Sequence, residues 1–279
     1  RNSFAPADPS ATTFAALKAD ASDKIDNATT SRWAGMLGGA QYHIEVPPAW
    51  NGKLVMYAHG YAGETNVLSV SDPSIRRYLI QNGYAWAASS YSKNFYDVRA
   101  GVEDTNALAL QFNAAEYFSL MVLGLITGHS MGGHITAAAI EDETYATANH
   151  KVKYDGAVPM CGVLGDTELF DYFAGAQVTA QALAGQASYP TPKWAEIVGQ
   201  VTPALFDTFT AASIDPSTPA GDKYALVVMN LTGGPRPLFD LGLGIGRSFQ
   251  AVWGVFGSDG TVNGILNKST LDTNRFTYT

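Results

Sequence analysis

The stretch LMVLGLITGHSMGGHITAAAI, residues 120–140, decides the fold. An apolar run ends in a glycine at position 128, Ser130 follows, and small residues then begin a helical pattern. The sequence therefore predicts a buried strand, a sharp turn and a helix, with Ser130 at the turn. A serine at such a turn has a strained backbone, and Gly128 and Gly132 remove side chains that would collide there. We expect its hydroxyl to stand clear of the sheet edge.

Strands and helices alternate along the first half of the chain. The expected strands comprise residues 32–37, 40–46, 53–58, 84–88, 120–126 and 154–160. The expected helices comprise residues 13–19, 72–80, 102–118 and 131–143, with Asp72 capping the second. Gly38 and Gly39 join the first two strands into a hairpin. The pattern predicts an α/β protein with a mostly parallel sheet and helices on both faces.

The sequence pattern of alternating strands and helices ends after Cys161. Residues 163–250 combine aromatic helical pieces with frequent prolines, which favours an inserted helical cap over further sheet. The alternative is an ordinary second layer of core. We therefore expect an N-terminal extension at 1–31, a core at 32–162, this cap, and a return to the core at 251–279, where an apolar run at 252–256 resembles a last strand.

Composition and charge limit the classes of protein and partner that fit this chain. The 279 residues carry a net charge of −8 with a pI near 5.0, and no cluster of lysine and arginine occurs, which argues against nucleic acid as a partner. No apolar run is long enough to span a membrane. Cys161 is the single cysteine, so no internal disulfide can form, and its apolar neighbours predict a buried thiol. The Thr-, Ser- and Ala-rich start is typical of a secreted or periplasmic chain. The oligomeric state is not set by these features.

A second glycine turn, HGYAG at residues 59–63, follows an apolar strand. Together with GHSMGG it resembles the α/β-hydrolase superfamily, in particular its esterases and lipases. The resemblance implies that Ser130 is the nucleophile and that the N–H groups of Met131 and Tyr61 form the oxyanion hole. It also implies hydrolysis of carboxylic esters through an acyl-enzyme, without cofactor or metal. The apolar cap favours an apolar acyl ester or a polyester as substrate.

The chain departs from the family in its histidines. The family order places an acid and then a histidine after the nucleophile, yet none of the five histidines follows residue 150. Side-chain direction favours local packing or hydrogen bonding for His129 and His134, and a structural hydrogen bond for His59. Asp259 is the acid candidate, with an ordinary turn residue as the alternative. The remaining histidines are His43, which we expect far from the site, and His150. We expect that a further C-terminal portion carries the last strands, the acid and the histidine.

Two other functions stay open. One is a catalytically inactive relative that binds an apolar ligand, and the other is a serine peptidase or acyltransferase on the same fold. A metal hydrolase is disfavoured, because His129 and His134 are five residues apart and face different sides of the expected helix.

Overall fold

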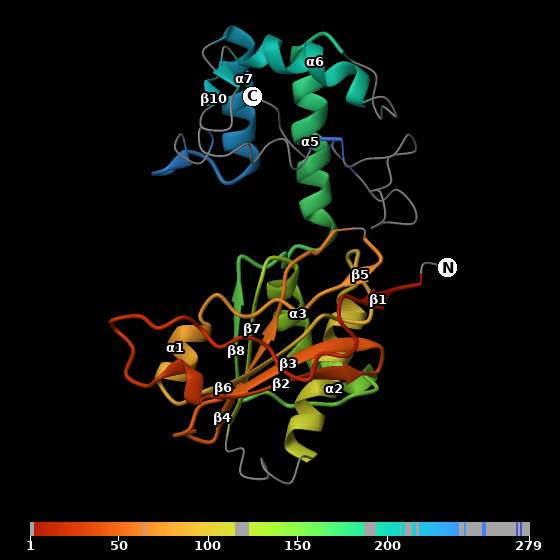
Figure 1. Ribbon diagram of the computed structural model, residues 1–279. Coiled ribbons are helices and arrows are strands. Elements are labelled where there is room, and N and C mark those ends of the chain that lie inside the picture. Colours follow the sequence, from red (N-terminus) through yellow and green to blue (C-terminus); the bar gives the residue numbers. More distant parts are fainter. Residues whose placement is uncertain are drawn as a thin grey trace. The chain divides into compact units, whose positions relative to one another are not determined.

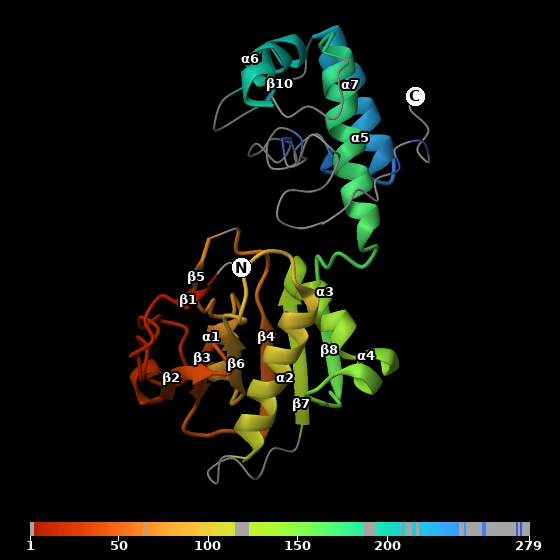
Figure 2. The ribbon, with the colours of Figure 1, turned by 90° about the vertical axis from the view of Figure 1, so that its right-hand side faces the viewer.

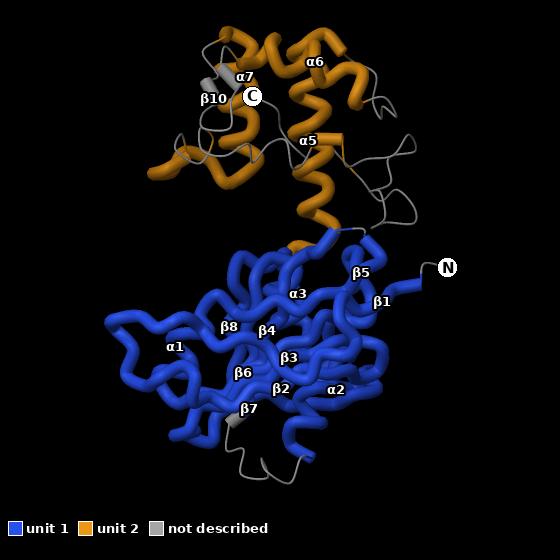
Figure 3. The backbone as a smooth tube through the Cα atoms, in the orientation of Figure 1, with its two compact units in different colours: residues 1–164 blue, residues 165–279 orange. Residues whose placement is uncertain are grey.

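A computed structural model describes residues 3–63, 65–114, 123–186, 194–206, 208–209, 214–215 and 218–239, together with residues 243, 253, 254, 272 and 274. The chain divides into two compact units, residues 1–164 and 165–279 (Figure 3). The division falls two residues after the predicted start of the cap at residue 163.

Unit 1 is built on a six-stranded sheet with the order β2-β3-β6-β4-β7-β8 (Figure 1). Its strands are β2 (Ser31–Leu37), β3 (Ala40–Val46), β4 (Lys53–Ala58), β6 (Ala85–Ser89), β7 (Leu123–His129) and β8 (Gly156–Met160). The pairings β6–β4, β4–β7 and β7–β8 are parallel, and β3 is antiparallel to both of its neighbours. The predicted mostly parallel sheet is confirmed, and so is the hairpin, in which Leu37 pairs with Ala40 around two glycines of positive φ.

Helices cover both faces of this sheet, as predicted. Alternate residues of β4 point to opposite sides, because side chains of a strand alternate. Leu54 and Met56 pack with α2 (Val98–Ala114) and α3 (Met131–Ala139), which lie in front of the sheet in Figure 2. Val55 and Tyr57 pack on the opposite side, in a cluster with residues of α1 (Arg76–Gln81). The sheet is therefore the middle layer of three.

A buried ion pair ties α1 to the sheet. Glu45 of β3 is completely buried, and its two oxygens accept from Arg76 Nε at 2.6 Å and Arg76 Nη2 at 3.1 Å. Trp86 Nε1 and the Thr30 hydroxyl donate to the same carboxylate, at 2.8 and 2.6 Å. All the hydrogen-bonding capacity of the carboxylate is thus directed to protein partners, which is what makes its burial tolerable.

The helix predicted at residues 13–19 is wrong. This segment forms neither helix nor strand, because side chains elsewhere take carbonyls that a helix would need. Arg32 Nε donates to the Phe14 carbonyl at 3.0 Å, and Arg76 Nη2 donates to the Ala15 carbonyl at 2.9 Å. Upstream of this segment, β1 (Ala5–Pro6) pairs with β5 (Val67–Leu68). Downstream of it, the 3₁₀ turn η1 (Asn27–Thr29) precedes β2.

Several helix boundaries also differ from prediction. Asp72 does not cap α1, which begins at Arg76, because its carboxylate accepts from Arg76 Nη1 at 2.9 Å and contacts His43 Nδ1 at 2.8 Å. The second helix, α2, begins four residues early, since Asp97 accepts from the Ala100 N–H at 2.8 Å. The helix expected at 131–143 is two helices, α3 and α4 (Asp142–Thr147). Residues 115–122 lie outside the described part of the chain.

The described residues of unit 2 include the helices α5 (Thr167–Leu183), α6 (Trp194–Leu205) and α7 (Pro219–Leu231), and the antiparallel strands β9 (Thr208–Phe209) and β10 (Ile214–Asp215). Its core includes Trp253, whose Nε1 donates to the Tyr224 hydroxyl at 3.1 Å and whose ring lies 5.4 Å from that of Trp194. The predicted helical character is confirmed. Trp253 packs within unit 2, whereas the sequence suggested a last strand of the core at 252–256. None of the described helices has the length and apolar character of a membrane span.

Candidate active site

Ser130 occupies a strained turn between β7 and α3. Its φ of 56° and ψ of −120° lie in a region that non-glycine residues rarely adopt. The residue is exposed, and its N–H donates to the Met160 carbonyl at the end of β8, at 3.0 Å. The backbone is therefore held by the neighbouring strand while the hydroxyl is accessible.

The glycines around Ser130 are required by close backbone contacts. A Cβ at Gly132 would lie 2.7 Å from the His59 carbonyl oxygen, and one at Gly128 would lie 2.6 Å from the Gly132 carbonyl carbon. A Cβ at Gly133 would lie 2.7 Å from Gly162 Cα. The turn is thus wedged between the ends of β4 and β8, as the Gly-x-Ser-x-Gly pattern predicts.

The glycine turn after β4 lies beside Ser130. A Cβ at Gly60 would be 3.4 Å from Ser130 Cβ and 4.0 Å from Ser130 Oγ, so the next residue, Tyr61, is close to the serine. Met131 is the first residue of α3, and its N–H has no acceptor within the helix. The structure brings together the backbone of both residues expected to form an oxyanion hole, and that role stays a prediction.

His59 fastens this turn to the loop after β6. Its Nδ1 lies 2.6 Å from the Gly60 carbonyl and its Nε2 lies 3.2 Å from the Ser90 carbonyl. The Tyr91 hydroxyl donates to the His59 carbonyl at 2.9 Å, and the two rings stack at 4.0 Å. Burial lowers the pKa of His59, so the ring is neutral and donates to one carbonyl at a time. The predicted structural hydrogen bond is confirmed.

Asn94 is a further positioning residue that sequence reasoning missed. Its side chain is buried, and Nδ2 donates to the carbonyls of Thr65 at 2.6 Å and Val67 at 2.9 Å. The neighbouring Phe95 N–H donates to the Gly63 carbonyl at 3.1 Å. These bonds hold the loop after β4 against the loop after β6. Asn94 lies in no motif, so only the fold reveals its role.

The histidines do not hydrogen-bond to the serine hydroxyl in the described part of the chain. His129 Nδ1 lies 3.2 Å from the Tyr57 hydroxyl, and His134 Nδ1 lies 3.1 Å from the Tyr96 hydroxyl, which confirms their predicted local roles. His43 contacts Asp72, and His150 Nδ1 lies 3.1 Å from a Glu103 carboxylate oxygen.

Two sequence predictions remain, one on an acid candidate and one on a thiol. Asp259, the acid candidate, lies outside the described residues. The prediction that Cys161 is buried is wrong, because its thiol is exposed. Cys161 directly follows β8, and its φ of 49° turns the chain at the end of the strand, outside the apolar layers.

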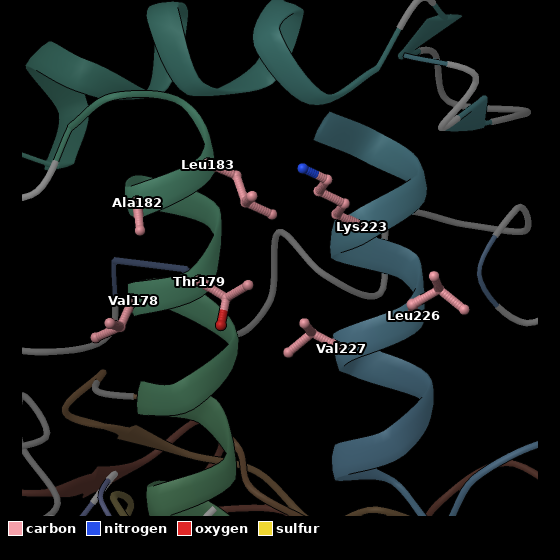
Figure 4. Close-up of a pocket in the computed structure, with 7 residues that line it drawn as sticks. All are labelled: Val178, Thr179, Ala182, Leu183, Lys223, Leu226 and Val227. Carbon is pink, nitrogen blue, oxygen red and sulfur yellow. The ribbon is translucent and has the colours of Figure 1, made fainter. Parts of the chain in front are cut away.

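Unit 2 carries an apolar groove between α5 and α7 (Figure 4). The groove has a volume of about 430 Å³, within the usual range for a small-molecule site. Thr179 and Leu183 of α5 point toward Lys223 and Val227 of α7 across it. Its remaining lining residues are Val178, Ala182 and Leu226. An apolar group could fit such a surface.

Comparisons with known proteins give only distant likenesses. No model of a known protein family matches the sequence, and no curated protein matches it. Among solved structures, a bacterial brefeldin A esterase matches with a TM-score of 0.33 and 19% identity, covering 46% of this chain and 38% of its own. Esterase B of Lactobacillus rhamnosis matches with a TM-score of 0.34 and 18% identity, covering 49% of this chain and 49% of its own. EstE5 matches with a TM-score of 0.36 and 18% identity, covering 79% of this chain and 65% of its own. The chain thus spans less than two thirds of each of these proteins.

The chain's own topology defines the class of fold. Among the strands of the six-stranded sheet, taken in chain order, β4 is the third and β7 the fifth. Ser130 follows the fifth strand at a strained strand-to-helix turn, and the glycine turn beside it follows the third. This is the arrangement of the α/β-hydrolase fold.

Proposed function

We propose that this chain is a serine hydrolase that cleaves carboxylic esters through an acyl-enzyme on Ser130. The observation that carries the proposal is the exposed, strained serine, with the Gly60–Tyr61 backbone on one side and the helix N-terminus at Met131 on the other. Strain of this kind persists only where the surrounding structure enforces it, and it is concentrated at functional sites.

The chemistry follows from this geometry. Ser130 Oγ attacks the ester carbonyl and gives its proton to a general base, and the carbonyl oxygen becomes an oxyanion. The N–H groups of Met131 and Tyr61 would stabilise that oxyanion, and loss of one such donor typically lowers turnover about 10²–10³-fold. The tetrahedral intermediate expels the alcohol, and water then releases the acid from Ser130.

We further propose an apolar acyl group or a polyester chain as the substrate, and a secreted or periplasmic location. The support is the aliphatic and aromatic composition of residues 163–250. The groove within unit 2 has the same character, since its described lining contains one charged side chain, Lys223. An apolar lining with few polar groups is typical of sites for such ligands.

Active-site labelling tests the nucleophile. The chain and its Ser130→Ala variant would each be treated with a fluorophosphonate probe and measured by intact mass. We expect one adduct on the chain and none on the variant. A folded chain that takes up no probe would contradict the proposal, because an activated serine is what the probe detects.

One observation favours a second candidate, an inactive protein that binds an apolar ester. The side chain of each of the five histidines has a partner other than the Ser130 hydroxyl in the described part of the chain, and none of these side chains hydrogen-bonds to that hydroxyl there. Ester binding without probe labelling or turnover would support this candidate. A peptidase or acyltransferase would instead cleave peptide amides, or transfer the acyl group to an added alcohol, faster than it hydrolyses p-nitrophenyl butyrate.

A further inference from the structure

A row of three aromatic rings lies beside the serine in unit 1. The ring of Tyr61 lies 6.5 Å from that of Tyr96 with an interplanar angle of 34°, and the Tyr96 ring lies 5.9 Å from that of His134. The Tyr96 hydroxyl is 3.1 Å from His134 Nδ1. Tyr61 remains 40% exposed, whereas Tyr96 packs partly against the core. The row therefore has one fixed end and one end accessible to a ligand.

Both ends of this row are tied to Ser130. Tyr61 directly follows Gly60, where a Cβ would lie 4.0 Å from Ser130 Oγ. His134 is one helical turn after the serine, and its backbone N–H donates to the Ser130 carbonyl at 3.1 Å. A substrate with one group in contact with Tyr61 would therefore be able to place its carbonyl at the serine.

The loop that carries Tyr96 is held in place on both sides. Before it, Phe95 has a φ of 64° and donates its N–H to the Gly63 carbonyl. After it, Asp97 accepts from the Ala100 N–H at the start of α2. A ring fixed in this way loses little freedom when another ring packs nearby, which favours binding.

We propose that Tyr61 and Tyr96 form a binding surface for an uncharged aromatic ring of the ester, so that aryl esters are preferred over aliphatic ones. Aromatic rings gain from offset or edge-to-face contacts beyond the area they bury, and saturated rings of the same size do not. This inference rests on the proposed function, because it concerns the substrate of the same serine.

The test measures binding to the Ser130→Ala variant, so that it does not depend on turnover. Isothermal titration calorimetry would compare phenyl acetate with cyclohexyl acetate, and methyl benzoate with methyl cyclohexanecarboxylate. We expect the aryl member of at least one pair to bind about two- to tenfold more tightly. A preference in the first pair places the ring in the alcohol half of the substrate, and a preference in the second places it in the acyl half.

Variants of the surface complete the experiment. In the same background, Tyr61→Leu should abolish the preference and Tyr61→Phe should keep it, since only the ring is needed. Tyr78→Leu is the matched control, because Tyr78 is 63% exposed on α1 and outside the row. Equal affinity within both pairs, undetectable binding included, would overturn the inference, as would a preference that survives Tyr61→Leu. Failure of fluorophosphonate labelling would instead remove the proposed catalysis and leave the binding result intact.

Discussion

Replacement of Gly132 by alanine tests the geometry of the turn directly. The added Cβ would lie 2.6 Å from the Ala58 carbonyl carbon and 2.7 Å from the His59 carbonyl oxygen, and real Cβ atoms do not approach within 3.0 Å. Both neighbours are backbone atoms at the end of β4, so no side-chain rotation relieves the collision. Helix α3 must move away from the sheet, and this opens the packing around the buried Met131 and Ile135. We expect a loss of about 3 kcal/mol in the free energy of unfolding.

Urea unfolding of the wild type and Gly132→Ala, followed by tryptophan fluorescence, would measure this loss. Hydrogen–deuterium exchange of peptides from β7 and α3 would locate it in unit 1. Gly199→Ala is the matched control, since Gly199 is exposed within α6 and a Cβ there meets no atom within 4 Å. The control should gain about 0.5–1 kcal/mol from helix propensity. A Gly132→Ala variant with wild-type stability and wild-type exchange at α3 would refute the described packing.

Three further predictions concern charge and exposure. Glu45→Gln should destabilise the chain by about 3 kcal/mol in urea unfolding, because it leaves Arg76 buried with a weakened partner, whereas Glu141→Gln at an exposed site should be nearly neutral; equal effects would contradict this. Burial lowers the pKa of His59 below its ordinary value of 6.5, so the unfolded chain binds a proton there first and stability falls as the pH drops below that value. His59→Asn should reduce this fall by up to about 1.4 kcal/mol per pH unit, and an identical fall in both proteins between pH 7.5 and 5.5 would exclude the effect. Finally, Cys161 should react with Ellman's reagent without denaturant, and a thiol that reacts only after unfolding would show that it is buried.

The sheet could be predicted because its signals are local. The strand at 53–58 was expected with the same bounds as β4, since its apolar run is bounded by glycine turns. The glycines at 38 and 39 likewise set the hairpin register. The segment at 13–19 could not be predicted, because its conformation depends on Arg32 and Arg76, which are distant in sequence and bind its carbonyls. Tertiary hydrogen bonds override helix propensity there.

Some residues of the candidate site could likewise be predicted from the sequence, and others could not. Gly128, Ser130 and Gly132 are recognisable because the turn itself requires them. Asn94 was not recognisable, because its amide acts on carbonyls almost thirty residues earlier in the chain, across two loops that only the fold brings together. The exposure of Cys161 was missed for a related reason. Its neighbours are apolar, but its position just past the end of β8 decides where the thiol points.

Backbone strain in unit 1 gathers at one edge of the sheet. Among the described non-glycine residues with positive φ, Ser130 and Cys161 directly follow β7 and β8, and Tyr91 and Phe95 lie in the loop after β6. These three strands are all parallel to β4, so their carboxyl ends share an edge. Each such residue costs about 1–3 kcal/mol, which a fold retains where the surroundings enforce it. Open α/β sheets bind ligands at this same edge. The location of the strain therefore supports the proposed site at this edge through residues outside the Gly-x-Ser-x-Gly motif as well. The proposed substrate would meet the serine, the glycine turn and the aromatic row there together.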